Sequence, residues 1–383
     1  MAEFTSEFQT TTEGLGAPGS SIDYFSARIE SLMLRRSDFA SDLDYQIESS
    51  KDSWSEVRDV RCEAPGITDR ELFANLRQHP EWGRIFKNPD RVILGRKIAE
   101  GGQAEIYEGL QRTSMEEAPT KEVVVKVFKK GYSLAALKSQ WPLGMVRKSS
   151  GNGSGWYCEP YTCWLMGVTL LHDGRVAFIL EAYWGDLRRL IDSLMLQRHK
   201  ENRRDQAPFE EKKAVRIMKQ IAEGMHNLHN NDILHRDLKA ANVLLWTSKR
   251  DADPRETDSM LCAIADFECS VGVVGTGFWR APEILLASKN SSIGLHVFTK
   301  EADVYSYAMT CYEVLTGRKP FEDHPVSQYD VVLSGQRPSL PASTHPQLRE
   351  LIAKCWHCDP STRPTFAEIK KELDRIIKSL QTK

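Results

Sequence analysis

One short polar segment constrains this 383-residue chain more than any other: His-Arg-Asp-Leu-Lys-Ala-Ala-Asn, at residues 235–242. Apolar residues enclose it on both sides, Ile233-Leu234 before it and Val243-Leu244-Leu245 after it. Short apolar runs around a polar turn are typical of buried strands that meet at a loop. The pattern predicts that Asp237 and Asn242 are held on one loop at the edge of a core.

These side chains have the chemistry that phosphoryl transfer requires. Such a site needs a carboxylate to orient or accept the proton of the attacking hydroxyl, and oxygen ligands for magnesium. Asp237 supplies the carboxylate, and Lys239 can neutralise a γ-phosphate. Asn242 and Asp266, the latter at the end of the apolar run 263–265, supply oxygen ligands of the kind that Mg²⁺ prefers.

With their neighbours, these residues resemble the catalytic domain of eukaryotic protein kinases over about residues 92–380. The segment 235–242 matches that family's catalytic loop without a departure. The resemblance implies that Asp237 is the catalytic base, that Lys239 contacts phosphate, and that Asn242 and Asp266 bind magnesium. It also implies ATP and Mg²⁺ as cofactors and a protein as substrate.

The upstream half resembles the family's nucleotide site. Val-Val-Val-Lys, ending at Lys126, resembles the motif of the lysine that contacts the α- and β-phosphates. Residues 98–106 resemble the glycine-rich loop, and residues 181–187 the hinge between the lobes. The nucleotide contacts that this resemblance implies are Ile98, Gly101, Gly102, Ile106, Lys126, Glu181, Tyr183 and Asp186.

Downstream, residues 275–283 resemble the end of a kinase activation segment. Asp303 resembles the helix aspartate that anchors the catalytic loop, and Arg363 the usual partner of Glu283. The lysine of the catalytic loop and the tryptophan before Ala-Pro-Glu are typical of the tyrosine-kinase-like group, whose members are mostly Ser/Thr kinases. The resemblance therefore implies a Ser/Thr protein kinase that acts in intracellular signalling.

Secondary-structure patterns agree with that fold. Strands are predicted at residues 91–97, 105–109, 122–128 and 177–181, and a long amphipathic helix at 209–230. Strands followed by helices predict an α+β protein with a small sheet lobe, about residues 91–181, and a helical lobe, about 186–380. Together they form a kinase domain at 91–380.

Two further regions precede the domain. Residues 1–20, rich in Ser, Thr and Gly, are predicted to be disordered, and 21–90 to be a helical extension. Amphipathic patterns within 21–60 fit either helices packed on the kinase or a surface for self-association or partner docking. Asp69 is predicted to cap a short helix at 71–78.

Several departures from the family pattern affect the nucleotide half. Ala99 and Ala104 replace two glycines of the glycine-rich loop, which predicts strain of about 1 kcal/mol at each position and weaker nucleotide binding. Val124 places extra methyl groups near the adenine site, and Glu268 replaces the glycine after Asp-Phe. These departures favour a second hypothesis, a pseudokinase that serves as a scaffold or allosteric partner.

The most consequential departure concerns the partner of Lys126. In this family the lysine pairs with a glutamate in a helix, but residues 134–148 contain no acidic residue, and Glu159 lies beyond them. Either another carboxylate, such as Glu105 or Asp266, pairs with Lys126, or the helix is remodelled. The activation segment is also short, and Ser270 and Thr276 are each either a phosphate acceptor or an ordinary loop or substrate-shelf residue.

Composition excludes other classes. Lys and Arg (51) balance Asp and Glu (53), which argues against a nucleic-acid binder. No apolar run is long enough to predict a membrane span. Cys355 and Cys358 have metal-like spacing without a second such pair, so packed thiols are the simpler interpretation. A cytoplasmic location, with the nucleus as an alternative, is the expectation.

Overall fold

The computed structural model describes residues 67–80, 82–112, 121–139, 161–163, 165–203, 205–247, 253–255, 260–267, 275–290, 294–325 and 327–381. All of them belong to one compact unit of the chain, Asp59–Lys383. The predictions for residues 1–20 and 21–60 lie outside the described residues.

In the described part of the chain, one antiparallel sheet has five strands in the order β1-β2-β3-β5-β4. The strands are β1 (Val92–Glu100), β2 (Ala104–Gln111), β3 (Lys121–Phe128), β4 (Leu165–Leu170) and β5 (Val176–Glu181). The helices of this half are α2 (Asp69–Gln78), η1 (Pro89–Arg91) and α3 (Leu134–Ser139). The four predicted strands are confirmed, whereas β4, buried along its whole length, has no alternating pattern that could have predicted it.

Strand β3 shows how the sheet places its lysine. Val123, Val125 and Val127 point to one face, where they belong to a buried apolar cluster. Because side chains alternate along a strand, Lys126 and Phe128 point to the opposite face, and Phe128 belongs to the larger core. Lys126 therefore lies on the face of the sheet from which it can reach Asp266, a residue of the second half of the chain.

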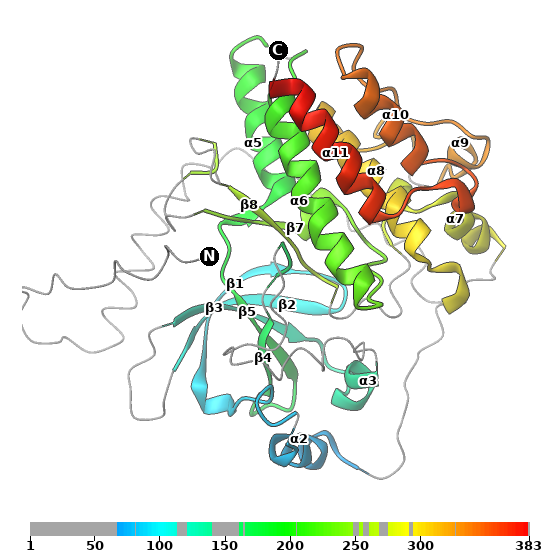
Figure 1. Ribbon diagram of the computed structural model, residues 1–383. Helices are drawn as coiled ribbons and strands as arrows, with labels where there is room; N and C mark the ends of the chain where they lie inside the picture. The colour runs from blue at the N-terminus through cyan, green and yellow to red at the C-terminus, as the bar shows by residue number, and fades with distance from the viewer. Residues whose placement is uncertain are drawn as a thin grey trace, which may run out of the picture. The chain divides into compact units, whose positions relative to one another are not determined.

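The second half is mainly helical (Figure 1). A small sheet of β6 (Gly185–Asp186), β7 (Val243–Trp246) and β8 (Leu261–Ile264) adjoins it. The α-helices are α5 (Leu187–Lys200), α6 (Glu211–Asn230), α7 (Pro282–Lys289), α8 (Lys300–Thr316), α9 (Asp330–Leu333), α10 (Pro346–Cys355) and α11 (Phe366–Gln381). The 3₁₀ turns are η3 (Ala240–Asn242), η4 (Gly277–Trp279), η5 (Leu295–Val297) and η6 (Pro360–Thr362). The predicted α+β class is confirmed.

Helix α8 is the centre of this half. Its residues from Ala302 to Leu315 are all buried, as expected for a helix surrounded by other elements. Helix α6 packs on it, and α11 runs beside α6 (Figure 1). Among the described residues, no helix has both the length and the apolar character needed to cross a membrane.

A glycine in α6 lets the two halves meet closely. Residues 161–163 run beside β8: Ile264 N donates to Tyr161 O (2.8 Å), and Cys163 N donates to Ile264 O (2.6 Å). A Cβ at Gly224 would lie 2.3 Å from Tyr161 O and 2.6 Å from Ile264 Cγ1. Only glycine therefore allows α6 to approach the strand that leads to Asp266.

Replacing Gly224 by alanine is expected to destabilise the fold by about 1–3 kcal/mol, because the overlap outweighs the roughly 1 kcal/mol by which alanine normally favours a helix. Urea unfolding measures the change. Gly102→Ala is the control, since a Cβ there meets nothing within 4 Å. Equal stability of Gly224→Ala and the wild type would contradict this account of the packing.

Candidate active site

Among the described carboxylates, Asp266 pairs with Lys126. The ammonium group forms an ion pair with Asp266 Oδ1, and the lysine side chain is 8% exposed against 50% for the aspartate. The positive charge of Lys126 lowers the pKa of Asp266 from its ordinary value, so the carboxylate is ionised at neutral pH. One of the two carboxylates that the sequence left open is thereby selected.

Glu105, the other candidate, is engaged elsewhere. It accepts hydrogen bonds from Lys97 Nζ (3.1 Å), Tyr107 Oη (3.0 Å) and Arg175 Nη1 (2.8 Å) on the surface of the sheet. The described part of α3 has no acidic side chain to offer, as the sequence indicated. Glu159 and the rest of the segment 134–148 lie outside the described residues.

Three side chains of the catalytic loop and activation segment form a closed triangle. Lys239 Nζ donates to Asp237 Oδ2 (2.7 Å) and to Thr276 Oγ1 (2.6 Å), and Thr276 Oγ1 donates to Asp237 Oδ1 (2.7 Å). Thr276 therefore closes the site and orients the carboxylate. Sequence analysis left two roles open for Thr276, and these contacts put it inside the cluster of candidate catalytic groups.

Asn242 joins this triangle to the strand that carries Asp266. Its Nδ2 donates to Asp237 O (2.7 Å) and Oδ2 (3.3 Å), so these contacts leave Oδ1 as the atom available for a cation. Its backbone oxygen accepts from Ala265 N (2.9 Å), one residue before Asp266. The two candidate magnesium ligands are thus held next to each other by the backbone.

Asp303 of α8 fixes the conformation of the catalytic loop. The carboxylate is 2% exposed and accepts from His235 N, Arg236 N and the ring of His229, at 2.8, 2.8 and 2.9 Å. Burial opposes its ionisation, but the hydrogen bond and charge of His229 and the proximity of His235 outweigh burial and lower the pKa of Asp303. The loop needs such a clamp, because Arg236 has a φ of 68° in the left-handed region.

A second carboxylate of α8, Glu313, was not recognised in the sequence. It is 1% exposed and accepts from Ala240 N (3.0 Å), Trp279 Nε1 (2.8 Å) and Arg188 Nη1 (3.2 Å). Burial raises the pKa of Glu313, against the opposing influence of the Arg188 charge. The glutamate stands in the short stretch Tyr312–Leu315, whose other residues are apolar or aromatic, and a charge in such a stretch was the signal that could have revealed it.

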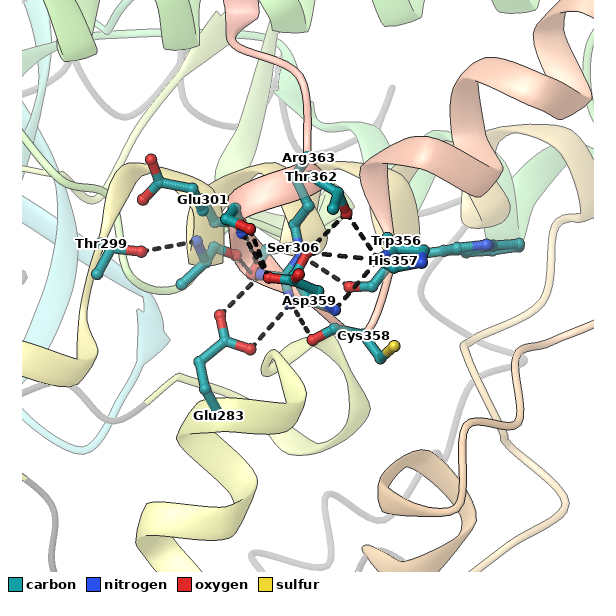
Figure 2. A network of polar contacts seen from close by, with 12 residues as sticks. Glu283, Thr299, Glu301, Ser306, Trp356, His357, Cys358, Asp359, Thr362 and Arg363 are labelled. Atoms are coloured by element: carbon teal, nitrogen blue, oxygen red, sulfur yellow. Dashed lines mark hydrogen bonds and ion pairs between the residues drawn. The ribbon is translucent and has the colours of Figure 1, made fainter.

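Glu283 of α7 and Arg363, just after η6, form an ion pair within a network of polar contacts (Figure 2). The guanidinium donates to both oxygens of Glu283, at 2.7 and 2.9 Å, and its side chain is fully buried. Further bonds to the backbone oxygens of Glu301 and His357 hold the arginine in place.

Cys355 is a buried thiol, and the described residues contain no cluster of three or more His, Cys, Asp or Glu side chains suited to a metal.

The glycine-rich loop corrects one expectation. Ala99 and Ala104 both lie in paired strands, and neither has a positive φ, so the strain predicted for alanine at these positions is absent. Gly101 N donates to Ala104 O (2.8 Å) and closes the hairpin. A β-hairpin of this kind does not require glycine at residues 99 and 104.

The remaining predicted nucleotide contacts lie on the strands of the sheet and on the segment that follows β5. Ile98 is exposed on β1, and Ile106 and Lys126 are opposite each other on β2 and β3. Glu181 ends β5, and Tyr183 packs on the core. Asp186 caps α5 by accepting from Arg189 N (2.9 Å), and burial raises the pKa of its carboxyl group. Glu268 and Ser270 lie outside the described residues.

Residues 92–373 match the family model for protein tyrosine and serine/threonine kinases. The chain belongs to this family. The predicted kinase domain and its two-lobed α+β fold are confirmed. Members of the family generally use ATP and Mg²⁺ and act on protein substrates.

Curated relatives agree with this assignment. A light-sensor protein kinase of Ceratodon purpureus is 35% identical over 55% of this chain and 17% of its own length. Serine/threonine-protein kinase STY17 of Arabidopsis thaliana is 36% identical over 45% of this chain and 29% of its own. Serine/threonine/tyrosine-protein kinase HT1 of the same plant is 26% identical, over 85% of this chain and 74% of its own. The chain thus spans less than a third of the first two relatives.

The clamp at Asp303 predicts a pH dependence. Because its pKa is lowered in the folded kinase, Asp303 contributes stability that is present above the ordinary aspartate pKa of about 4 and is lost as the pH falls through the lowered value. The free energy of unfolding of Asp303→Asn should therefore be about 2–4 kcal/mol lower than that of the wild type at pH 7. This difference should become smaller below about pH 4. Urea unfolding of the two proteins across this pH range measures the difference in stability. A difference that does not change with pH would contradict the prediction.

Proposed function

We propose that this chain is an ATP- and Mg²⁺-dependent kinase that phosphorylates Ser and Thr hydroxyls of proteins in signalling. The observation that carries the proposal is the triangle of Asp237, Lys239 and Thr276, with Asn242 bonded to its carboxylate. Phosphoryl transfer depends mainly on positioning and electrostatics, and this cluster supplies both.

Asp237 is the group that orients the substrate hydroxyl and accepts its proton. Its carboxylate is held from two sides by Lys239 and Thr276, so it has one orientation. Lys239 lies 2.7 Å from this carboxylate, where its charge can also stabilise the phosphoryl group in transfer. Asp303 and Glu313 keep the loop in place through backbone hydrogen bonds.

Asn242 and Asp266 are the groups that would hold magnesium, and Lys126 the group that would bind the α- and β-phosphates. The donor set fits, because an amide oxygen and an ionised carboxylate are hard oxygen ligands. Magnesium would neutralise the negative charge that develops on the phosphates. Lys126 and Asp266 already lie in contact, so a charged group for phosphate and one for metal are held side by side.

Ser/Thr specificity is supported by Lys239 and Thr276 and by the names of two relatives. STY17 and STY46 of Arabidopsis thaliana are both named serine/threonine-protein kinases. HT1 is named a serine/threonine/tyrosine kinase, which makes tyrosine phosphorylation an alternative outcome. A pseudokinase scaffold is the second candidate, motivated by the helix carboxylate that α3 lacks.

Asp237→Asn is expected to lower the rate of phosphoryl transfer on the order of 10²–10⁴-fold, because the amide cannot accept the hydroxyl proton. Transfer of radiolabelled γ-phosphate to a generic acceptor protein measures the rate, and phosphoamino-acid analysis identifies the acceptor hydroxyl. Equal incorporation by the variant and the wild type would contradict the proposed enzyme and support the scaffold.

Stabilisation by ATP is expected to require Mg²⁺ and Asp266. At a nucleotide concentration 100 times Kd, the free energy of unfolding should rise by about 2.7 kcal/mol. Asp266→Ala should lose this gain, while Asp330→Ala, which removes a surface ion pair with Lys289, should keep it. Thermal unfolding with and without Mg²⁺ distinguishes the cases, and an equal gain in both variants would remove Asp266 from the site.

A further inference from the structure

Residues upstream of the family match are built into the sheet half. Phe73 and Leu76 of α2 are buried, and the Phe73 ring packs edge-on against Phe86 with centroids 5.6 Å apart. Residues 85–87 then pair with β4, where Lys87 N donates to Val168 O (2.8 Å) and Val168 N to Ile85 O (2.9 Å). This segment lies before residue 92, where the match begins.

The two acidic residues in the first turn of α2 have different tasks. Glu71 forms a capping box with Thr68, which is the N-cap, so the prediction that Asp69 caps this helix is wrong. Leu134 is the first residue of α3, and its backbone N–H donates to Asp69 Oδ1 at 2.9 Å. A carboxylate is favourable there, because the first N–H groups of a helix lack partners within it and carry partial positive charge.

A packed path leads from α3 to the lysine of the site. Leu134 and Leu137 are 0% and 1% exposed and belong to the same core as Phe128. The ring of Phe128 lies 6.0 Å from the ring of Tyr132, two residues before α3, and Lys126 Nζ lies 5.6 Å from the centroid of the Phe128 ring. A shift of α3 would therefore move the apolar wall beside the ammonium group.

We propose that Asp69 is a positioning residue for phosphoryl transfer, which holds α3 in place and through it the setting of Lys126. In the described part of α3, Leu134 and Leu137 link this helix to the core that contains Phe128, so the packing of the helix bears on the surroundings of Lys126. The proposal rests on the kinase function proposed above, and it gives the segment before residue 92 a direct influence on nucleotide binding.

The test compares Asp69→Ala, Asp69→Asn and Glu71→Ala in the full chain. Asp69→Ala should raise the KM for ATP and the Kd for MgATP about tenfold, the scale expected when the loss of one charged hydrogen bond is felt at the ligand site. Asp69→Asn should stay within about twofold of the wild type, because its amide oxygen still accepts from Leu134 N. Hydrogen exchange should become faster in α3 of the alanine variant alone.

Glu71→Ala is the matched control. It removes an acidic first-turn residue and the side-chain half of the capping box of the same helix, and the side-chain hydrogen bonds of Glu71 go to Thr68 rather than to α3. The stability of this variant should therefore fall while its affinity for MgATP holds. Equal losses of affinity in Asp69→Ala and Glu71→Ala, or unchanged affinity in Asp69→Ala, would overturn the proposal. A fluorescent ATP analogue reports the Kd even if the wild type transfers no phosphate. A wild type that binds the analogue but transfers no phosphate would overturn only the proposed function. A wild type that binds no MgATP would overturn the proposed function and the role of Asp69.

Discussion

The site depends on a buried negative charge, Asp303, in the buried helix α8. Asp303 turns two backbone N–H groups of the catalytic loop inward, and this compensates for the left-handed conformation of Arg236. Glu313, further along α8, holds the next part of the loop and Trp279. Because one rigid helix carries both carboxylates, Asp237 and the end of the activation segment are positioned relative to the same frame.

Much of this arrangement could be predicted because its determinants are local in the sequence. The spacing from Asp237 to Asn242 places both on one loop whatever surrounds it, and the apolar runs on either side predict the strand that follows. The β-branched run of β3 likewise predicted the strand, and the structure shows Lys126 on the face opposite Val123, Val125 and Val127. The roles of Asp303 and of the Glu283–Arg363 pair were inferred from resemblance to a family. In the structure Asp303 accepts from the backbone of the catalytic loop, and Arg363 donates to Glu283.

Other features could not be predicted, since they depend on which distant segments meet. Composition showed that α3 lacks a carboxylate, but it could not choose between Glu105 and Asp266 as the partner of Lys126. Asp69 was assigned to its own helix because capping patterns are local, whereas its hydrogen bond reaches a residue 65 positions away. Ala104 was expected to be strained, because the rule assumed a left-handed backbone that a paired strand does not have.

The charges of the site are balanced in pairs, and this has a consequence for its ligands. Among the described residues, Lys126 lies against Asp266 and Lys239 lies against Asp237, so each lysine has a carboxylate beside it. A nucleotide without metal would repel both aspartates, and a metal without nucleotide would repel both lysines. When a polyanion binds together with its own cation, the polyanion can pair with Lys126 and the cation with Asp266. The charges of both side chains then remain compensated. Within the proposed function, the site is therefore suited to the magnesium–nucleotide complex rather than to either component alone.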